Sequence, residues 1–233
     1  MHDAMLTRAP SRTLEQNDRR LVFASGGLTV FAEDGPASVA RHLHPAWKVV
    51  LPDRGPAEAG RISAAGLLVP PQLAHTAAVT SAYTALFVDP WLLPPSRPEV
   101  AALDARAVRR VRAAMAAGAD AAMAELGALV GVGAALDPRV AHALERAADL
   151  ASLDSIAAEV GLSAPRLRAL VRESVGIPLV RLRQWARLRT AVAHLGRSSV
   201  ASAAAMAGFA DQAHLTRTSR AFLGRTPVSL RTT

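Results

Sequence analysis

Three histidines stand at a spacing that could hold a metal ion or a small ligand. His42 and His44 are two residues apart, and His75 follows the turn-forming segment Pro70-Pro71-Gln72. Alternate side chains of an extended strand share one face, so His42 and His44 would point the same way. As neutral imidazoles all three could ligate a metal ion, and they could equally line a pocket or pack in a core.

A second pattern that carries chemistry is a turn that occurs twice near the C-terminus. In each copy a small residue is followed by Gly and then by an apolar anchor: Ala157, Gly161 and Leu167, then Ala204, Gly208 and Leu215, with the copies 47 residues apart. This spacing is typical of a helix-turn-helix, because the small residue lets the helices approach and Gly adopts the positive φ of the turn. Helix-Gly-helix corners also occur in other helical proteins, so the repetition matters more than either copy.

Helical periodicity divides the second helix of each copy into two faces. At 100° per residue the apolar anchors turn inward: Leu167, Leu170 and Val171, then Leu215, Thr218 and Phe222. A DNA-binding helix-turn-helix places its second helix in the major groove, so the outward residues would contact DNA. They are Pro165, Arg166, Arg168, Ala169 and Arg172 in the first copy, and Gln212, Ala213, His214, Thr216, Arg217 and Arg220 in the second.

One long helix is predicted between the two copies, over residues 178–195, and it carries Arg181, Arg183, Arg187 and Arg189. At about 1.5 Å of rise per residue this helix is roughly 27 Å long, which approaches the roughly 34 Å of one turn of B-DNA. Two recognition helices held by it could enter successive major grooves of double-stranded DNA. Its Arg side chains could instead be solvated or paired with acids.

The net charge of +8 is concentrated in the same region. Residues 1–98 carry nine Lys or Arg against eight Asp or Glu, residues 99–136 carry four against four, and residues 137–233 carry fourteen against seven. A nearly neutral N-terminal part followed by a basic C-terminal part predicts that only the C-terminal end binds a polyanion. A solvated Arg-rich surface would give the same count.

The hydrophobic pattern predicts an α+β chain with two domains. Short apolar runs broken by Gly and Pro indicate a small antiparallel β-sandwich or barrel. The chain from Asp137 onward reads as helices, with Asp137, Ser152 and Ser163 as N-caps. We therefore divide the chain into an N-terminal tail, a sensor domain, a helical linker and a helical DNA-binding domain, at residues 1–20, 21–95, 96–136 and 137–233.

The helical region resembles the AraC/XylS-type transcriptional regulators over about residues 137–231. The shared segments are DPRV, the first turn, GIPLVRLRQWARLRTA and, most specific of all, GFADQAHLTRTSRAFLGRTP. The resemblance implies a domain with two helix-turn-helix units that binds promoter DNA in a bacterial cytoplasm. It also implies contact with RNA polymerase if the protein is an activator, and a homodimer formed through the helical linker, which could instead be simply packed.

Three features depart from that family's pattern. Ser219 stands in place of a core Phe, Ala210 replaces a capping Ser so that Asp211 would cap the second recognition helix, and the first recognition helix has Pro and Ala at central reading positions. Pro and Ala donate no side-chain hydrogen bond, whereas Arg217 can chelate guanine and Gln212 can pair with adenine. We expect the second unit to read sequence and the first to anchor through its flanking Arg residues.

The histidine pattern resembles the cupin barrel, in which an HxH motif and a later His converge inside the barrel. Cupins usually have an acidic fourth ligand four residues after HxH, where this chain has Lys48, and a cation opposes metal binding. We therefore predict a cupin-like sensor with no metal and no cofactor. His42, His44, Trp47 and His75 are expected to line a pocket for a small-molecule effector.

Composition excludes several classes of function. The chain has no Cys, so disulfides, cysteine-ligated metals and thiol nucleophiles are excluded. It has no apolar run of the ~20 residues that span a bilayer, so no membrane contact is expected. The leading hypothesis is a sequence-specific, effector-responsive transcriptional regulator that is not an enzyme. The alternatives are a metal-dependent cupin enzyme with an accessory helical domain and a non-specific nucleic-acid-binding protein.

Overall fold

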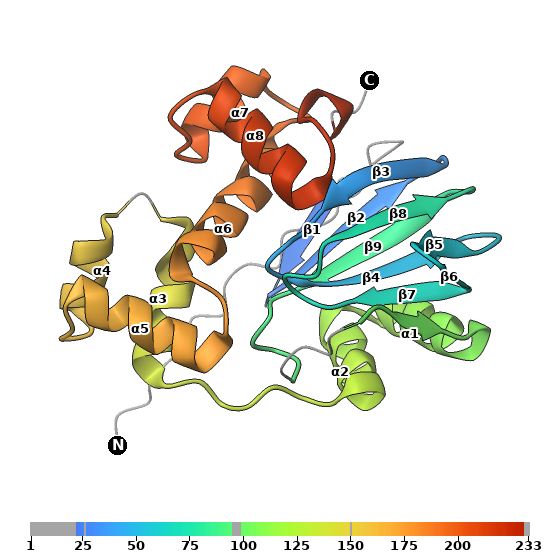
Figure 1. The fold of residues 1–233 in the computed structure, drawn as a ribbon, viewed down its shortest axis with the longest axis horizontal. Coiled ribbons are helices and arrows are strands. Elements are labelled where there is room, and N and C mark those ends of the chain that lie inside the picture. The colour runs from blue at the N-terminus through green and yellow to red at the C-terminus, as the bar shows by residue number, and fades with distance from the viewer. Residues whose placement is uncertain (1–21, 26, 95–98, 150, 231–233) are drawn as a thin grey trace.

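The computed structural model describes residues 22–25, 27–94, 99–149 and 151–230, so the predicted N-terminal tail lies outside the described residues. Its N-terminal part, here called the β domain (residues 22–103), is built of strands (Figure 1). Their bounds are β1 Val22–Ser25, β2 Leu28–Glu33, β3 Ala37–His42, β4 Trp47–Pro52, β5 Ala57–Ala59, β6 Ile62–Ala64, β7 Gly66–Val69, β8 His75–Val79, β9 Tyr83–Val88 and β10 Ala101–Leu103.

The strands form two antiparallel sheets that enclose an apolar core. One sheet has the order β1-β2-β9-β4-β7-β10 and the other has the order β3-β8-β5-β6. Val50 and Leu67 of the first sheet and Ala57 and Val79 of the second belong to one buried cluster. The predicted small antiparallel β architecture is therefore confirmed, as two facing sheets.

A helical hairpin covers the outer face of the larger sheet, and it consists of α1 (Ala105–Ala117) and α2 (Ala119–Val130). Val111 and Leu126 of the hairpin pack in one cluster with Trp47, Val49 and Leu51 of β4. β4 is thus buried on both faces, so its sequence has no alternation of apolar and polar residues. Within the linker predicted as helical from residue 96, the first element among the described residues is strand β10, which pairs with β7.

The C-terminal part is helical throughout, which confirms the predicted α+β class. Its elements are α3 (Pro138–Glu145), the 3-10 helix η1 (Arg146–Ala148), α4 (Leu153–Glu159), α5 (Ala164–Val175), α6 (Leu179–His194), α7 (Val200–Met206), α8 (Gln212–Leu223) and the 3-10 helix η2 (Val228–Leu230). The three predicted caps are confirmed, because the side chains of Asp137, Ser152 and Ser163 each accept a hydrogen bond from a first-turn N–H.

Both turns of the repeated motif have the predicted backbone. Gly161 and Gly208 adopt φ of 68° and 73°, the left-handed conformation that links α4 to α5 and α7 to α8. Ser219, which replaces a core Phe, is fully buried, and its hydroxyl donates to the carbonyl of Arg225 at 2.8 Å. Asp211 takes over the cap of α8, and its carboxylate accepts the N–H of His214 at 2.6 Å.

Within the described part of the chain, no helix combines the length and the apolar character needed to cross a lipid bilayer.

The Asp211 cap gives a stability prediction. Replacing Asp211 by Ala removes the acceptor for the His214 N–H and should lower the free energy of unfolding by about 1 kcal/mol. Asp211→Asn keeps a capping oxygen without the charge, so it should lose less than half as much. Urea denaturation of both variants measures the difference, and an unchanged midpoint in Asp211→Ala would show that the cap does not stabilise α8.

Candidate DNA-binding surface and domain interface

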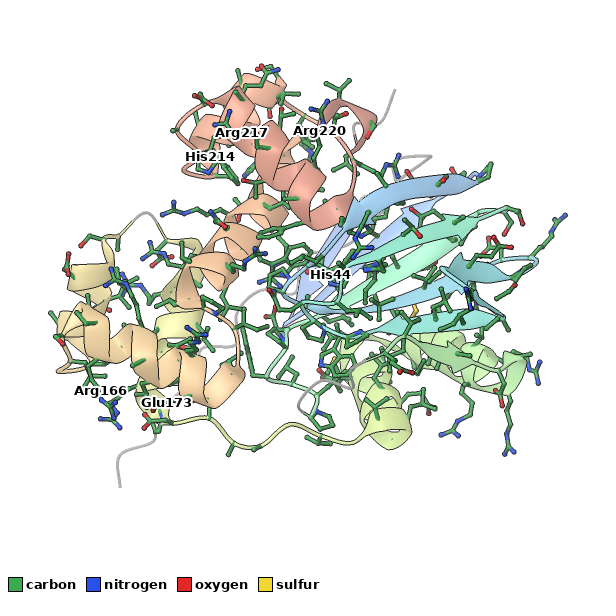
Figure 2. All side chains as sticks on the ribbon, in the orientation of Figure 1. His44, Arg166, Glu173, His214, Arg217 and Arg220 are labelled. Atoms are coloured by element: carbon green, nitrogen blue, oxygen red, sulfur yellow. The ribbon has the colours of Figure 1, made fainter. Side chains whose placement is uncertain are left out.

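α5 presents the predicted basic face to solvent. Leu167 and Val171 are buried beneath the helix, whereas Arg166, Arg168 and Arg172 are exposed. Arg166 forms a loose ion pair with Glu173 of the same helix, with Nη1 and Oε1 3.8 Å apart (Figure 2). Arg168 has no ion-pair partner among the described residues, so its guanidinium is free to contact phosphate.

α8 presents the predicted reading residues on one side of the helix. Gln212, Ala213, Thr216, Arg217 and Arg220 share this solvent-facing side. His214 differs from them, because its ring packs edge-on against Phe209 with the centroids 5.1 Å apart. Gln212 and Arg217 are exposed, so the groups that can pair with adenine and guanine face solvent.

α6 connects the two helix-turn-helix units through arginines that donate hydrogen bonds to main-chain carbonyls. Arg183 donates to the carbonyls of Asp149 and Ala151 at 3.1 and 2.6 Å, before α4. Arg187 donates to the carbonyl of Gly208, in the turn between α7 and α8, at 3.3 Å. The sequence suggested that the arginines of this helix are solvated or paired with acids, and it did not indicate hydrogen bonds to backbone carbonyls. These hydrogen bonds fix the spacing of α5 and α8.

α6 also docks on the β domain, as Figure 1 shows where the helix passes the ends of the strands. The ring of Trp185 packs on Phe87 of β9 with centroids 5.1 Å apart, and it also contacts Phe222 of α8 at 6.3 Å. Trp185, Leu188 and Ala191 therefore belong to the same buried cluster as the interior of the β domain. The core of the second helix-turn-helix unit is continuous with the core between the sheets.

Two buried ion pairs cross the same interface. Arg189 of α6 meets Asp89 with Nη1 and Oδ1 3.0 Å apart, and burial raises the pKa of Asp89 against the opposing effect of Arg189. Arg225 meets Glu33 at 2.6 Å, and Glu33 also accepts the hydroxyl of Tyr83 at 2.6 Å. Burial and this hydrogen bond raise the pKa of Tyr83, so the phenol stays protonated.

A small cavity lies in the interface, with a volume of about 60 Å³. Its walls come from both domains, with Phe31, Tyr83 and Phe87 from the strands and Trp185, Leu188 and Val192 from α6. The Lys48 ammonium lies 5.6 Å from the Phe87 ring centroid, and Arg189 and Arg225 also line the cavity. The indole N–H of Trp185 has no hydrogen-bond partner among the described residues.

The three histidines converge, although only two of them lie on strands. His42 of β3 pairs in register with His75 of β8, and their ring centroids are 4.3 Å apart. His44 follows the end of β3, and its ring lies 5.1 Å from that of His75 and 5.5 Å from Phe87. Trp47 does not join them, because it lies in the cluster beneath α1 and α2.

The three imidazoles are neutral. Burial, followed by the charge of Lys48, lowers the pKa of His42 to about 3 and that of His75 to about 4. The same two causes lower the pKa of the fully buried His44. Burial, with the charge of Arg225, lowers the pKa of Lys48 to about 8.

The sequence carried no signal for the buried ion pairs and only a weak one for the shared core. Asp89 and Glu33 stand next to Pro90 and Asp34-Gly35, and such positions usually indicate solvent-exposed turns. Leu188 and Val192, which line the interface cavity, extend the apolar face of α6, and an apolar face of this length is the signal that could have indicated a further packing partner.

Comparison with known proteins agrees with this architecture. Residues 156–233 match the family model of a helix-turn-helix domain, and no curated protein matches the chain in sequence. Apo ToxT from Vibrio cholerae is similar in structure, with a TM-score of 0.55, 10% identity and coverage of 88% of this chain and 97% of that one.

Two further ToxT structures from the same organism carry ligands. One, bound to an unsaturated fatty acid, has a TM-score of 0.52, 12% identity and coverage of 93% and 96% of the two chains. The other, bound to (E)-4-(8-methylnaphthalen-1-yl)but-3-enoic acid, has a TM-score of 0.54, 10% identity and coverage of 87% and 96%. The domain match and the shared two-domain fold confirm the resemblance to AraC-type regulators that the sequence indicated.

The Arg189–Asp89 pair can be tested by removing one partner. Arg189→Met leaves the Asp89 carboxylate buried without its cation and should destabilise the protein by about 3 kcal/mol in urea denaturation. Adding Asp89→Asn should restore part of that loss, because the uncompensated charge is then removed. Arg109→Met, on the exposed face of α1, is the control and should change stability by less than about 0.5 kcal/mol. Equal losses in Arg189→Met and Arg109→Met would contradict a stabilising interface pair.

Proposed function

Starting from an AraC-type helix-turn-helix domain joined to a ToxT-like β domain, we propose that the protein is a sequence-specific transcriptional regulator of double-stranded DNA. The observation that carries this proposal is the pair of solvent-facing helices, α5 and α8, which α6 holds at a fixed spacing through Arg183 and Arg187. A rigid connection lets both helices enter neighbouring major grooves without ordering a linker on binding.

The two units have different roles in this proposal. On α8, Gln212 and Arg217 present an amide and a guanidinium that can each make two hydrogen bonds to a purine edge. On α5, Pro165 is exposed beside Arg166 and Arg168, so that surface offers mainly charge to the DNA backbone. α8 then determines sequence preference, and α5 adds affinity.

The second part of the proposal is that an amphipathic carboxylate binds in the interface cavity as effector. The walls are largely aromatic and aliphatic, and two of the three cations that line the cavity, Arg189 and Arg225, are already paired with acids. The charge of Lys48 and the N–H of Trp185 are therefore the groups that could receive a carboxylate. The two liganded ToxT structures carry molecules of this chemical type.

The size of the cavity connects effector binding to DNA binding. A volume of about 60 Å³ holds only a few water molecules, so a larger ligand would displace side chains of the walls, which include Trp185 and Phe87, or separate α6 from the strands. Either movement changes how α8 is held against the β domain. An effector of this size would thus shift the population of DNA-binding conformations.

The remaining sequence predictions stay proposals. A homodimer through α1 and α2 would use the outer surface of the hairpin, because Val108, Val111, Ala122 and Leu126 are already buried on the β domain. Contact with RNA polymerase is expected only if the protein activates transcription. No comparison supports the enzyme alternative.

Selection of bound DNA from a random pool with the full chain tests the first part, and an enriched motif is expected. On the selected DNA, Arg217→Ala should lose at least about tenfold in preference over random DNA. Arg168→Ala should weaken binding to all sequences alike and reduce the salt dependence by about one phosphate contact. Arg109→Ala, outside the DNA-binding domain, is the control. Recovery of no motif would contradict sequence-specific binding, and loss of preference in Arg168→Ala alone would reverse the two roles.

Calorimetry with an unsaturated long-chain fatty acid tests the second part. Lys48→Met removes the cation that has no ion-pair partner among the described residues, and it should lower affinity by about tenfold, the worth of one charge-assisted hydrogen bond. Arg54→Met, exposed on the same domain, should bind as the unmodified chain does. If Lys48→Met kept full affinity, the carboxylate would not lie at this cation.

A further inference from the structure

Three buried nitrogens meet in the β domain with no hydrogen-bond partner in the part of the chain that the structure describes. They are the Nε2 atoms of His42, His44 and His75. These residues are 4%, 0% and 6% exposed. One ring nitrogen from each lies within 4.8 Å of the others. Buried polar atoms are nearly always paired, so three unpaired nitrogens at one place need a physical reason.

The opposite side of each ring supplies that reason. The Nδ1 atoms lie 2.8, 2.7 and 3.0 Å from the carbonyls of Ala40, Ala46 and Leu73. A carbonyl only accepts, so each Nδ1 carries the proton and each Nε2 keeps its lone pair. Metal-bound histidines are oriented in the same way, by a backbone or carboxylate acceptor behind the ring.

The loops that carry the histidines are also fixed to one another. Gln72 donates its N–H to the carbonyl of His44 at 2.8 Å, although its own φ is +61°, in the region that glycine favours. This bond ties the turn before His75 to the segment after β3. The three rings are therefore positioned before any ligand arrives, and Figure 2 shows His44 at the end of the sheets nearest α6.

We propose that His42, His44 and His75 bind one divalent transition-metal ion through their Nε2 atoms. Three neutral imidazoles suit Zn²⁺, Co²⁺ or Fe²⁺ and do not suit Mg²⁺ or Ca²⁺, which prefer oxygen ligands. Three protein ligands leave at least one coordination position for water or an anion.

The prediction of no metal rested on Lys48, which stands where cupins usually have an acidic ligand. The position of its ammonium in the structure alters that argument. Its ammonium lies over the Phe87 ring, 5.6 Å from the ring centroid, and lines the interface cavity. Its charge weakens cation binding at the histidines. The same charge favours an anion, such as hydroxide or a carboxylate, in the open coordination position.

The site lies directly beneath the end of α8, so occupancy would also affect DNA binding; this part rests on the proposed function. The N–H of Leu43, between His42 and His44, donates to the carbonyl of Ala221 at 3.2 Å. A Cβ at Gly224, the residue that ends α8, would lie 3.0 Å from Nδ1 of His42. Ion binding would hold the three rings, and therefore the strand end on which α8 rests, in one position.

Titration of the metal-stripped full chain with Co²⁺ tests the site without DNA. Visible absorption should report a nitrogen-ligated ion, and equilibrium dialysis should give one ion per chain. His44→Leu and His75→Asn should each lower the affinity at least about 100-fold. His194→Asn, a histidine outside the cluster, is the matched control. Absence of binding, or equal binding by the cluster variants, would overturn the metal site.

A stability measurement separates a metal site from histidines that merely pack. Without metal, His75→Leu should denature at the same urea concentration as the unmodified chain or a higher one, because it removes a buried nitrogen that lacks a partner. With Co²⁺ present, only the unmodified chain and His194→Asn should gain stability. A lower metal-free midpoint in His75→Leu, with no Co²⁺ effect on the unmodified chain, would mean that the histidines serve packing.

DNA binding forms the last arm. Zn²⁺ should change the affinity of the unmodified chain for its selected DNA by about fivefold or more, and it should leave the cluster variants unchanged. Metal binding without that change would overturn the regulatory part. If the chain bound no DNA sequence selectively, the proposed function would fail while the Co²⁺ measurements still decided the metal site.

Discussion

The contact between Trp185 and Phe87 is the constraint on which the arrangement of the two domains depends. Trp185 lies on α6, the helix that also carries the cores of both helix-turn-helix units, and Phe87 lies on β9 in the middle of the larger sheet. The aromatic contact joins two hydrophobic cores into one cluster. Because close-packed cores deform little, a shift of α6 relative to the strands moves the second unit as a body.

Phe87 also links the interface cavity to the histidine cluster. One edge contact joins it to His44 with centroids 5.5 Å apart, and Lys48 lies over its face. A carboxylate in the cavity and an ion at the histidines would therefore act on neighbouring atoms. The two inputs would be coupled if each favoured a different position of α6 and α8, and such coupling is reciprocal.

The basic charge of the C-terminal part is divided between DNA and the protein itself. Arg183 and Arg187 bind backbone carbonyls, and Arg189 and Arg225 pair with acids of the β domain. These four arginines would add little to phosphate binding while the domains stay docked. A charge count therefore overstates the electrostatic contact with DNA, which falls chiefly to the exposed arginines of α5 and α8.

The sequence by itself determined the local features: the two turns with Gly161 and Gly208, the caps, and the buried and exposed faces of α5 and α8. Each depends on residues within a few positions of one another, through φ preference, capping hydrogen bonds and helical period. The convergence of the three histidines was implied by the resemblance to the cupin barrel, whereas their spacing alone placed only His42 and His44 on one face. Only the tertiary structure decided what Asp89, Glu33 and Trp185 do, because their partners lie in the other domain. The tertiary structure also separated Trp47 from the histidines. Adjacent residues of a strand face opposite sides of the sheet, and Trp47 lies on the side of β4 that α1 and α2 cover.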